Sequence, residues 1–199
     1  MRYLLRLAND RGYVPKDVRR VQMEIRELLG SSYKIGNLRI SSSAIEFDLF
    51  SAKNELEKAR ELLEHGVSKV TTLRSIDPRV SLRSEDETLK EGIDLFNQER
   101  FWEAHESLEE IWHPAKGLDR EVIQGLILTA AAFVHFQKDE TAVTLSILGR
   151  ALEKLGTTNT FRGYDVDNLR ANIRRILERK EPTLFQVELA NSRVSSGTR

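Results

Sequence analysis

The sequence predicts an α+β protein in which an N-terminal ferredoxin-like (βαββαβ) sandwich is followed by an all-α helical bundle. Three observations lead to this prediction. In residues 1–76, short runs with alternating apolar and polar side chains are interleaved with two stretches of helical spacing. From residue 84 onward, the apolar stripes have helical spacing. The chain has 199 residues, which is enough for two domains of ordinary size.

The order of elements in residues 1–76 is strand, helix, strand, strand, helix, strand, which is the order of a split βαβ sandwich. Pro15 suits the first turn of the first helix and Gly30 suits the position just after its end. The clearest strand alternates Ile45, Phe47 and Leu49 with acidic residues. The expected elements are a strand at 3–7, a helix at 15–29, two strands around the serines at 41–43, a helix that stops at Gly66 and a strand at 67–76.

The second half of the chain begins after a predicted linker at 77–83. Ser84 and Glu87 have the spacing of a capping box, in which each side chain bonds the other residue's backbone N–H at the start of a helix. We expect a helical bundle at 84–181 with five helices, at about 85–97, 101–115, 119–138, 140–155 and 165–180. Pro182 ends the last helical pattern, so residues 182–199 are predicted to form a flexible tail.

Composition and charge narrow the function classes. Lys plus Arg and Asp plus Glu are both 31, and a net charge of zero argues against a dedicated nucleic-acid-binding protein. The chain has no cysteine, which excludes disulfides, thiolate metal sites and cysteine nucleophiles. The first residues lack the apolar core of a signal peptide, and the longest apolar stretch, 122–136, is shorter than the ~20 residues that span a bilayer. We therefore expect a cytoplasmic protein without a membrane segment.

The predicted helix at 101–113 has two faces whose composition is unusual for a surface in contact with water. One is a plain apolar stripe at helical spacing, made up of Phe101, Ala104, Leu108, Ile111 and Ala115. The other mixes tryptophans with histidines and carboxylates: Trp102, His105, Glu106, Glu109, Trp112 and His113. Tryptophan is an unusual choice for a fully solvated face, so this second face predicts a half-buried polar pocket.

The helix at 119–138 is apolar almost all round and is expected to run through the middle of the bundle. Gln124 and His135 share one face of it and need polar partners there. If this helix is antiparallel to the previous one, Glu109 lies level with Gln124, and His135 lies ~9 Å beyond the level of His105. The predicted pocket comprises Trp102, His105, Glu106, Glu109, Trp112, Gln124 and His135.

Three interpretations of this pocket remain open. It forms a structural hydrogen-bond network, a binding pocket for a small molecule or protein partner, or a site for a single divalent metal held by His105 and Glu109. Glu110 and His113 form a Glu-x-x-His pair, but the second such pair of a di-iron bundle is absent. No serine stands in a nucleophile context, and no glycine-rich phosphate loop is present. No organic cofactor is expected.

Residues 89–156 resemble the helical family catalogued as domain of unknown function three-hundred-and-nine. The residues that carry the resemblance are Phe96-Asn97, Phe101-Trp102-Glu103-Ala104-His105-Glu106, Glu109, Trp112, Gln124-Gly125-Leu126-Ile127, Ala131-Ala132, His135 and Arg150-Ala151. The resemblance implies a few packed helices and a family without an established activity. Leu128 stands where the family often has a second glutamine, and Lys138-Asp139-Glu140 replaces a turn that usually contains glycine. The polar face of the central helix is therefore thinner here.

Taken together, the sequence favours a non-enzymatic binding or assembly module that uses the polar-aromatic pocket, with the sandwich as a dimerisation or partner-binding element. The first alternative is a metal-dependent hydrolase centred on His105 and Glu109. The second is an RNA-binding protein that acts through its βαββαβ domain, although no Lys/Arg-Gly-aromatic signature supports it.

Overall fold

The structure is a computed structural model that describes residues 1–75 and 83–190. The chain divides into two compact units, one made up of residues 1–81, to which residues 137–139 are also assigned, and one made up of the rest. The predicted linker lies outside the described residues except for Arg83, and so does the 191–199 part of the predicted tail. Each unit is described by itself.

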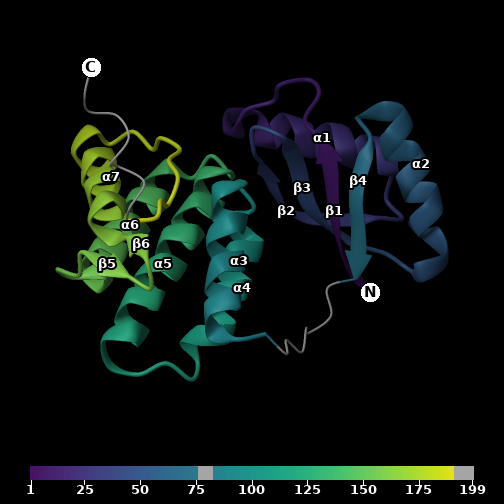
Figure 1. The fold of residues 1–199 in the computed structure, drawn as a ribbon. Coiled ribbons are helices and arrows are strands. Elements are labelled where there is room, and N and C mark those ends of the chain that lie inside the picture. The colour runs from purple at the N-terminus through teal and green to yellow at the C-terminus, as the bar shows by residue number, and fades with distance from the viewer. Residues whose placement is uncertain (76–82, 191–199) are drawn as a thin grey trace, which may run out of the picture. The chain divides into compact units, whose positions relative to one another are not determined.

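The first unit is a four-stranded antiparallel sheet with two helices (Figure 1). Its elements follow the predicted order: β1 (Arg2–Ala8), α1 (Val18–Leu29), β2 (Lys34–Ile40), β3 (Ala44–Phe50), α2 (Leu56–Gly66) and β4 (Val70–Ser75). A 3-10 turn precedes each helix, at Pro15–Asp17 and at Lys53–Glu55. The strand order is β2-β3-β1-β4, so the two strands that meet in the middle of the sheet, β3 and β1, are far apart in sequence.

The core of this unit lies between the sheet and both helices. Leu5 of β1 lies opposite Phe47 of β3 and Leu73 of β4, on the face where alternate residues of the strands point inward. Ile25 of α1 and Leu63 of α2 belong to the same buried cluster. Both helices therefore pack on one face of the sheet, as the alternation of apolar residues predicts.

The second unit is built from α3 (Glu85–Asn97), α4 (Phe101–Trp112), α5 (Gly117–Phe136), α6 (Thr141–Leu155) and α7 (Val166–Arg179). Each of these helices packs against the next one along the chain. The predicted capping box is formed: the Glu87 N–H donates to Ser84 Oγ (3.3 Å), and the Ser84 N–H donates to Glu87 Oε2 (2.9 Å). The α+β class and the helical second half are thereby confirmed, and the predicted ends of α4 and α5 differ by up to three residues.

Phenylalanines dominate the centre of the helical unit. Phe96 at the end of α3 lies 4.9 Å from Phe101 and 5.6 Å from Phe133 between ring centroids, mostly edge to face. Such ring pairs contribute about 0.5–1.5 kcal/mol each beyond the area they bury. Phe185, from the segment after α7, completes the cluster at 5.7 Å from Phe96 and 5.4 Å from Phe133.

Residues 182–190, the described part of the predicted tail at 182–199, make contacts with the helical unit. Val187 is only 6% exposed, and its backbone accepts from and donates to the side chain of Asn97. The Asp165 N–H donates to Glu188 O at 2.8 Å, and the Ala190 N–H donates to Gly163 O at 2.9 Å. The side chains of Phe185 and Val187, together with these backbone hydrogen bonds, attach the segment after α7 to the helical unit.

A short hairpin between α6 and α7 was not predicted. Its strands are β5 (Thr160–Phe161) and β6 (Tyr164–Asp165), joined by Arg162 and Gly163, which both have positive φ, at 45° and 87°. Positive φ at both central residues is typical of a type I′ turn, the two-residue turn whose twist matches that of hairpin strands. None of the described helices is long and apolar enough to cross a membrane.

Candidate functional site

Helix α4 buries its first face in the core of the helical unit. Phe101, Ala104, Leu108 and Ile111 are between 0% and 4% exposed. The backbone of α4 is thus fixed by its apolar stripe, and the second face is held in one orientation. That second face is a stripe with spacings of three, four and three residues, made up of Trp102, His105, Glu109 and Trp112. We call these four residues the α4 seam.

At the N-terminal end of the α4 seam, the rings of Trp102 and His105 are stacked. Their centroids are 6.0 Å apart and their planes differ by 7°. One turn further on, His105 Nδ1 lies 3.8 Å from Glu109 Oε2, which is close enough for charge attraction and too long for a hydrogen bond. His105 Nδ1 is buried and forms no hydrogen bond with any described residue. Burial lowers the pKa of His105, and the carboxylate of Glu109 opposes that shift.

At the other end of the α4 seam, Trp112 lies under an arginine. The guanidinium carbon of Arg120 is 3.8 Å from the centroid of the Trp112 ring, which is cation–π geometry. Arg120 Nη1 also donates to the backbone carbonyls of Trp112 (3.1 Å) and His113 (3.2 Å), so it satisfies acceptors that the end of α4 leaves open. Trp112 Nε1 is buried and has no hydrogen-bond partner in the described part of the chain.

In the described part of the chain, Gln124 and His135 form no hydrogen bond with the α4 seam. Glu106 is half-buried on α4 beside the seam. The expected pair between Glu109 and Gln124 is not formed, because no hydrogen bond links these side chains. His135 Nδ1 instead contacts Glu140 Oε2, across the turn between α5 and α6. The structure thus forms close pairs along α4 itself and gives His135 a partner of its own.

The α4 seam offers two side chains that could bind a metal ion. His105 and Glu109 supply one imidazole and one carboxylate within reach of each other. Among residues 1–75 and 83–190, no three His, Cys, Asp or Glu side chains cluster in a way that could hold a metal ion. Ser107, the serine nearest to this face in sequence, is buried and donates to Thr88 O at 3.3 Å, a structural role.

The sheet of the first unit bears on the RNA-binding alternative. On the face opposite the two helices, Arg6 pairs with Glu46 at 2.7 Å, and Arg2 pairs with Asp48 at 2.8 Å. Arg39 lies 3.6 Å from the same Glu46. Arginines that already face carboxylates offer less to a phosphate backbone. This face therefore adds no support for RNA binding.

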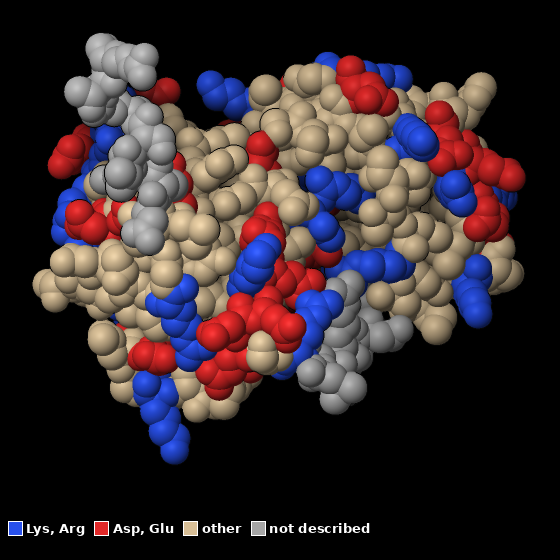
Figure 2. Space-filling view, in the orientation of Figure 1, with Lys and Arg blue, Asp and Glu red and all other residues tan. Residues whose placement is uncertain are grey.

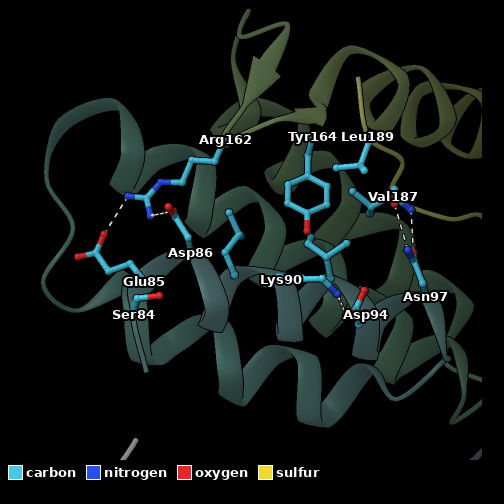
Figure 3. Close-up of a pocket in the computed structure, with 12 residues that line it drawn as sticks. Ser84, Glu85, Asp86, Lys90, Asp94, Asn97, Arg162, Tyr164, Val187 and Leu189 are labelled. Carbon is cyan, nitrogen blue, oxygen red and sulfur yellow. Dashed lines mark hydrogen bonds and ion pairs between the residues drawn. The ribbon is translucent and has the colours of Figure 1, made fainter. Parts of the chain in front are cut away.

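A groove that the sequence did not predict lies on the helical unit, between α3 and the β5–β6 hairpin with the segment that follows α7. Its volume is about 930 Å³ (Figure 3). Arg162, at the tip of the hairpin, pairs across one end with Glu85 at 2.9 Å and Asp86 at 3.0 Å. Asn97 closes the other end by bonding both backbone groups of Val187, at 2.8 and 3.0 Å. The residues between these ends include Leu89, Lys90, Ile93, Asp94, Tyr164 and Leu189.

Comparison with known proteins agrees with the resemblance seen in the sequence. Residues 89–146 match the model of a family described as Domain of unknown function (DUF309). An uncharacterized protein from Aquifex aeolicus (strain VF5) is 29% identical over 122 residues, which is 60% of this chain and 36% of that protein. The match thus spans about a third of the relative's length. No solved structure matches, so the ferredoxin-like assignment of the first unit stays a prediction that rests on its element order.

The residues that carry the DUF309 resemblance have two kinds of role in this chain. Phe96, Phe101 and Ala104 are core residues. Glu103 is only 8% exposed and is held by two 2.8 Å bonds from Arg100. These residues explain packing. In the α4 seam, Trp102 and Trp112 are partly buried and pack against this core, and His105 and Glu109 are the polar members of the stripe.

Proposed function

We propose that the helical unit is a non-enzymatic binding module and that the α4 seam is its contact surface for a small molecule or a partner protein. The observation that carries the proposal is the pair of buried nitrogens without partners, His105 Nδ1 and Trp112 Nε1, on one stripe of one helix. A buried polar group without a hydrogen bond costs about 1–3 kcal/mol, so such groups are uncommon unless something else uses them.

The chemistry of the α4 seam suits recognition. Tryptophan offers a large apolar surface with one donor, and it is enriched among residues that dominate binding energy. The Glu109 side chain is 47% exposed and can accept hydrogen bonds from a ligand. Burial lowers the pKa of His105 and so favours the neutral imidazole. A neutral imidazole has one donor nitrogen and one acceptor nitrogen. An occupant with a donor can pair with Glu109, and it reaches the buried nitrogens of His105 and Trp112 only if the side chains that cover them move aside.

The enzyme alternative, a metal-dependent hydrolase centred on His105 and Glu109, needs more ligands than these two. Catalytic zinc sites hold three protein ligands and leave one position open. The described residues bring no third ligand to this pair. Elemental analysis of the purified protein after incubation with zinc, iron or manganese tests it, and one bound equivalent of metal would favour the hydrolase over the binding module.

The chain contains two tryptophans, and both lie in the α4 seam, which makes a direct test possible. Protein labelled with 5-fluorotryptophan gives one fluorine signal for Trp102 and one for Trp112, and Trp102→Phe assigns them. We expect a library of small aromatic, amide and amine compounds to include several that shift these signals in a saturable way. A library that leaves both signals in place at millimolar concentration would contradict the proposal.

A further inference from the structure

The groove between α3 and the β5–β6 hairpin has an apolar floor. Leu89 and Ile93 of α3 form part of it, at 1% and 2% exposed, and Val187 adds to it at 6%. Leu189 lines the groove with a side chain that is 57% exposed. Most of the exposed apolar surface among these residues belongs to Leu189, and such surface gains free energy when another apolar side chain covers it.

The rim of this groove is acidic, in a chain whose net charge is zero. Helix α3 has the sequence EDETLKEGIDLFN, with five acidic residues and one lysine. In Figure 2 acidic side chains gather over this helix. Among the residues that line the groove, Glu85, Asp86 and Asp94 are acidic and Lys90 and Arg162 are basic, so the lining has one more carboxylate than cations. Lys90 pairs with Asp94 at 2.6 Å, and Arg162 pairs with Glu85 and Asp86. The charge therefore favours a cationic occupant.

A hydroxyl without a partner lies between the floor and the rim. The ring of Tyr164 reaches down from β6, and its oxygen points toward α3 near Lys90 (Figure 3). No hydrogen bond joins this oxygen to any residue in the described ranges. Burial and the charge of Asp94 raise the pKa of Tyr164, so the hydroxyl keeps its proton and can both donate and accept. An occupant with backbone groups can use it.

We propose that this groove binds an extended segment of a partner protein in which apolar side chains alternate with lysine or arginine. Helix α3 has 13 residues, about 20 Å, which matches about six residues of extended chain. In an extended segment, alternate side chains point to opposite sides, so one set covers the apolar floor while the other meets the carboxylates. The groove shares no residue with the α4 seam, so this site goes beyond the function proposed above and does not depend on it.

The test uses the full-length protein and three fluorescein-labelled nine-residue peptides, followed by fluorescence anisotropy. The first alternates leucine with lysine and serine, the second replaces lysine by glutamate, and the third keeps lysine but replaces leucine by glycine. We expect saturable binding of the first peptide and binding at least tenfold weaker for each of the others. Raising the salt from 0.05 to 0.5 M should weaken the first about tenfold, because screening shortens the reach of the rim charges.

Two substitutions assign the binding to the groove. Asp94→Asn removes a rim charge and frees Lys90 to repel the peptide, and Leu189→Ser removes an exposed apolar side chain. Each should weaken binding about five- to tenfold. Glu178→Gln, an exposed carboxylate of α7 outside the groove, is the matched control and should change nothing. Equal affinity for the lysine and glutamate peptides, no effect of Asp94→Asn, or displacement of the peptide by an equal concentration of spermine would each overturn the proposal.

Discussion

Gly125 of α5 lies directly against Leu155 at the end of α6. A β-carbon added to Gly125 would lie 2.7 Å from Leu155 Cγ and 3.1 Å from the Leu155 backbone nitrogen. The first distance is shorter than side-chain carbons tolerate, and the second involves backbone that cannot turn away. Helices α5 and α6 therefore lie in close contact at Gly125. A larger residue at this position would force the two helices apart.

Gly125→Ala is expected to destabilise the protein even though alanine is the better helix former. Overpacking of a well-packed core costs about 1–3 kcal/mol, and the gain in helix propensity offsets about 1 kcal/mol of this. Gly149, inside α6, has nothing within 4 Å of an added β-carbon, so Gly149→Ala is the matched control and should stabilise by up to about 1 kcal/mol. Urea unfolding of both variants measures the difference. A stable Gly125→Ala variant would show that the helices are not in close contact here.

Asn97→Ala is expected to release the segment after α7 from the helical unit. Asn97 Nδ2 donates to Val187 O, and the Val187 N–H donates to Asn97 Oδ1, so the substitution leaves two backbone groups without partners. The cost is about 1–3 kcal/mol. Amide hydrogen exchange of Val187 should accelerate strongly. Asn172→Ala, at a side chain that bonds within its own helix, should leave that exchange rate as it is. Unchanged Val187 exchange in Asn97→Ala would refute this role.

Arg162→Gln is expected to weaken the attachment of the hairpin in a salt-dependent way. The guanidinium lies 2.9 Å from Glu85 and Asp119 and 3.0 Å from Asp86, and these carboxylates raise its pKa. The loss in stability should be on the order of 1 kcal/mol at low salt, because exposed ion pairs are screened and only a network adds appreciably. In 1 M sodium chloride the gap between variant and wild type should nearly close. An equal gap at both salt concentrations would mean that packing, rather than charge, is lost.

Stability should depend on pH through His105. Because burial lowers the pKa of His105 in the folded state, the unfolded chain binds the proton more readily. The neutral His105 contributes its full stabilisation when the pH is above 6.5, the ordinary pKa of histidine. This stabilisation is lost as the pH falls from 6.5 toward the lower pKa of His105 in the folded protein. His105→Gln should flatten this part of the stability profile. NMR titration of the His105 ring checks the sign directly, and a midpoint at or above 6.5 would contradict it.

Local signals in the sequence predicted most of the fold. The Ser84–Glu87 capping box acts over three residues, and the apolar stripe of α4 repeats within one helix, so both are visible without tertiary structure. The same holds for the pair of His105 and Glu109, which are one helical turn apart. The capping box and the apolar stripe were predicted correctly because the interacting groups are neighbours in sequence, and the pocket or metal site at His105 and Glu109 stays a prediction.

Contacts between distant residues were missed for the opposite reason. Asn97 and Val187 are 90 residues apart, and Arg162 and Glu85 are 77 apart, so no spacing rule connects them. The hairpin strands have two residues each, too few for a period of two to show. The dipeptide Arg162-Gly163 was the available signal, since glycine suits the positive φ of a two-residue turn. His135 contacts Glu140 across the short turn between α5 and α6, a partner that the spacing of residues on one helix face did not indicate.

The central claim is that the α4 seam binds an occupant, and it is tested most directly by the dissociation constant of the tightest compound that shifts the fluorotryptophan signals. It should be measured for the wild type, Glu109→Gln and Glu110→Gln. Glu109 belongs to the seam, and Glu110 is its exposed neighbour on another side of the helix. The account predicts binding about tenfold weaker for Glu109→Gln and unchanged for Glu110→Gln. Equal dissociation constants for all three proteins would contradict it.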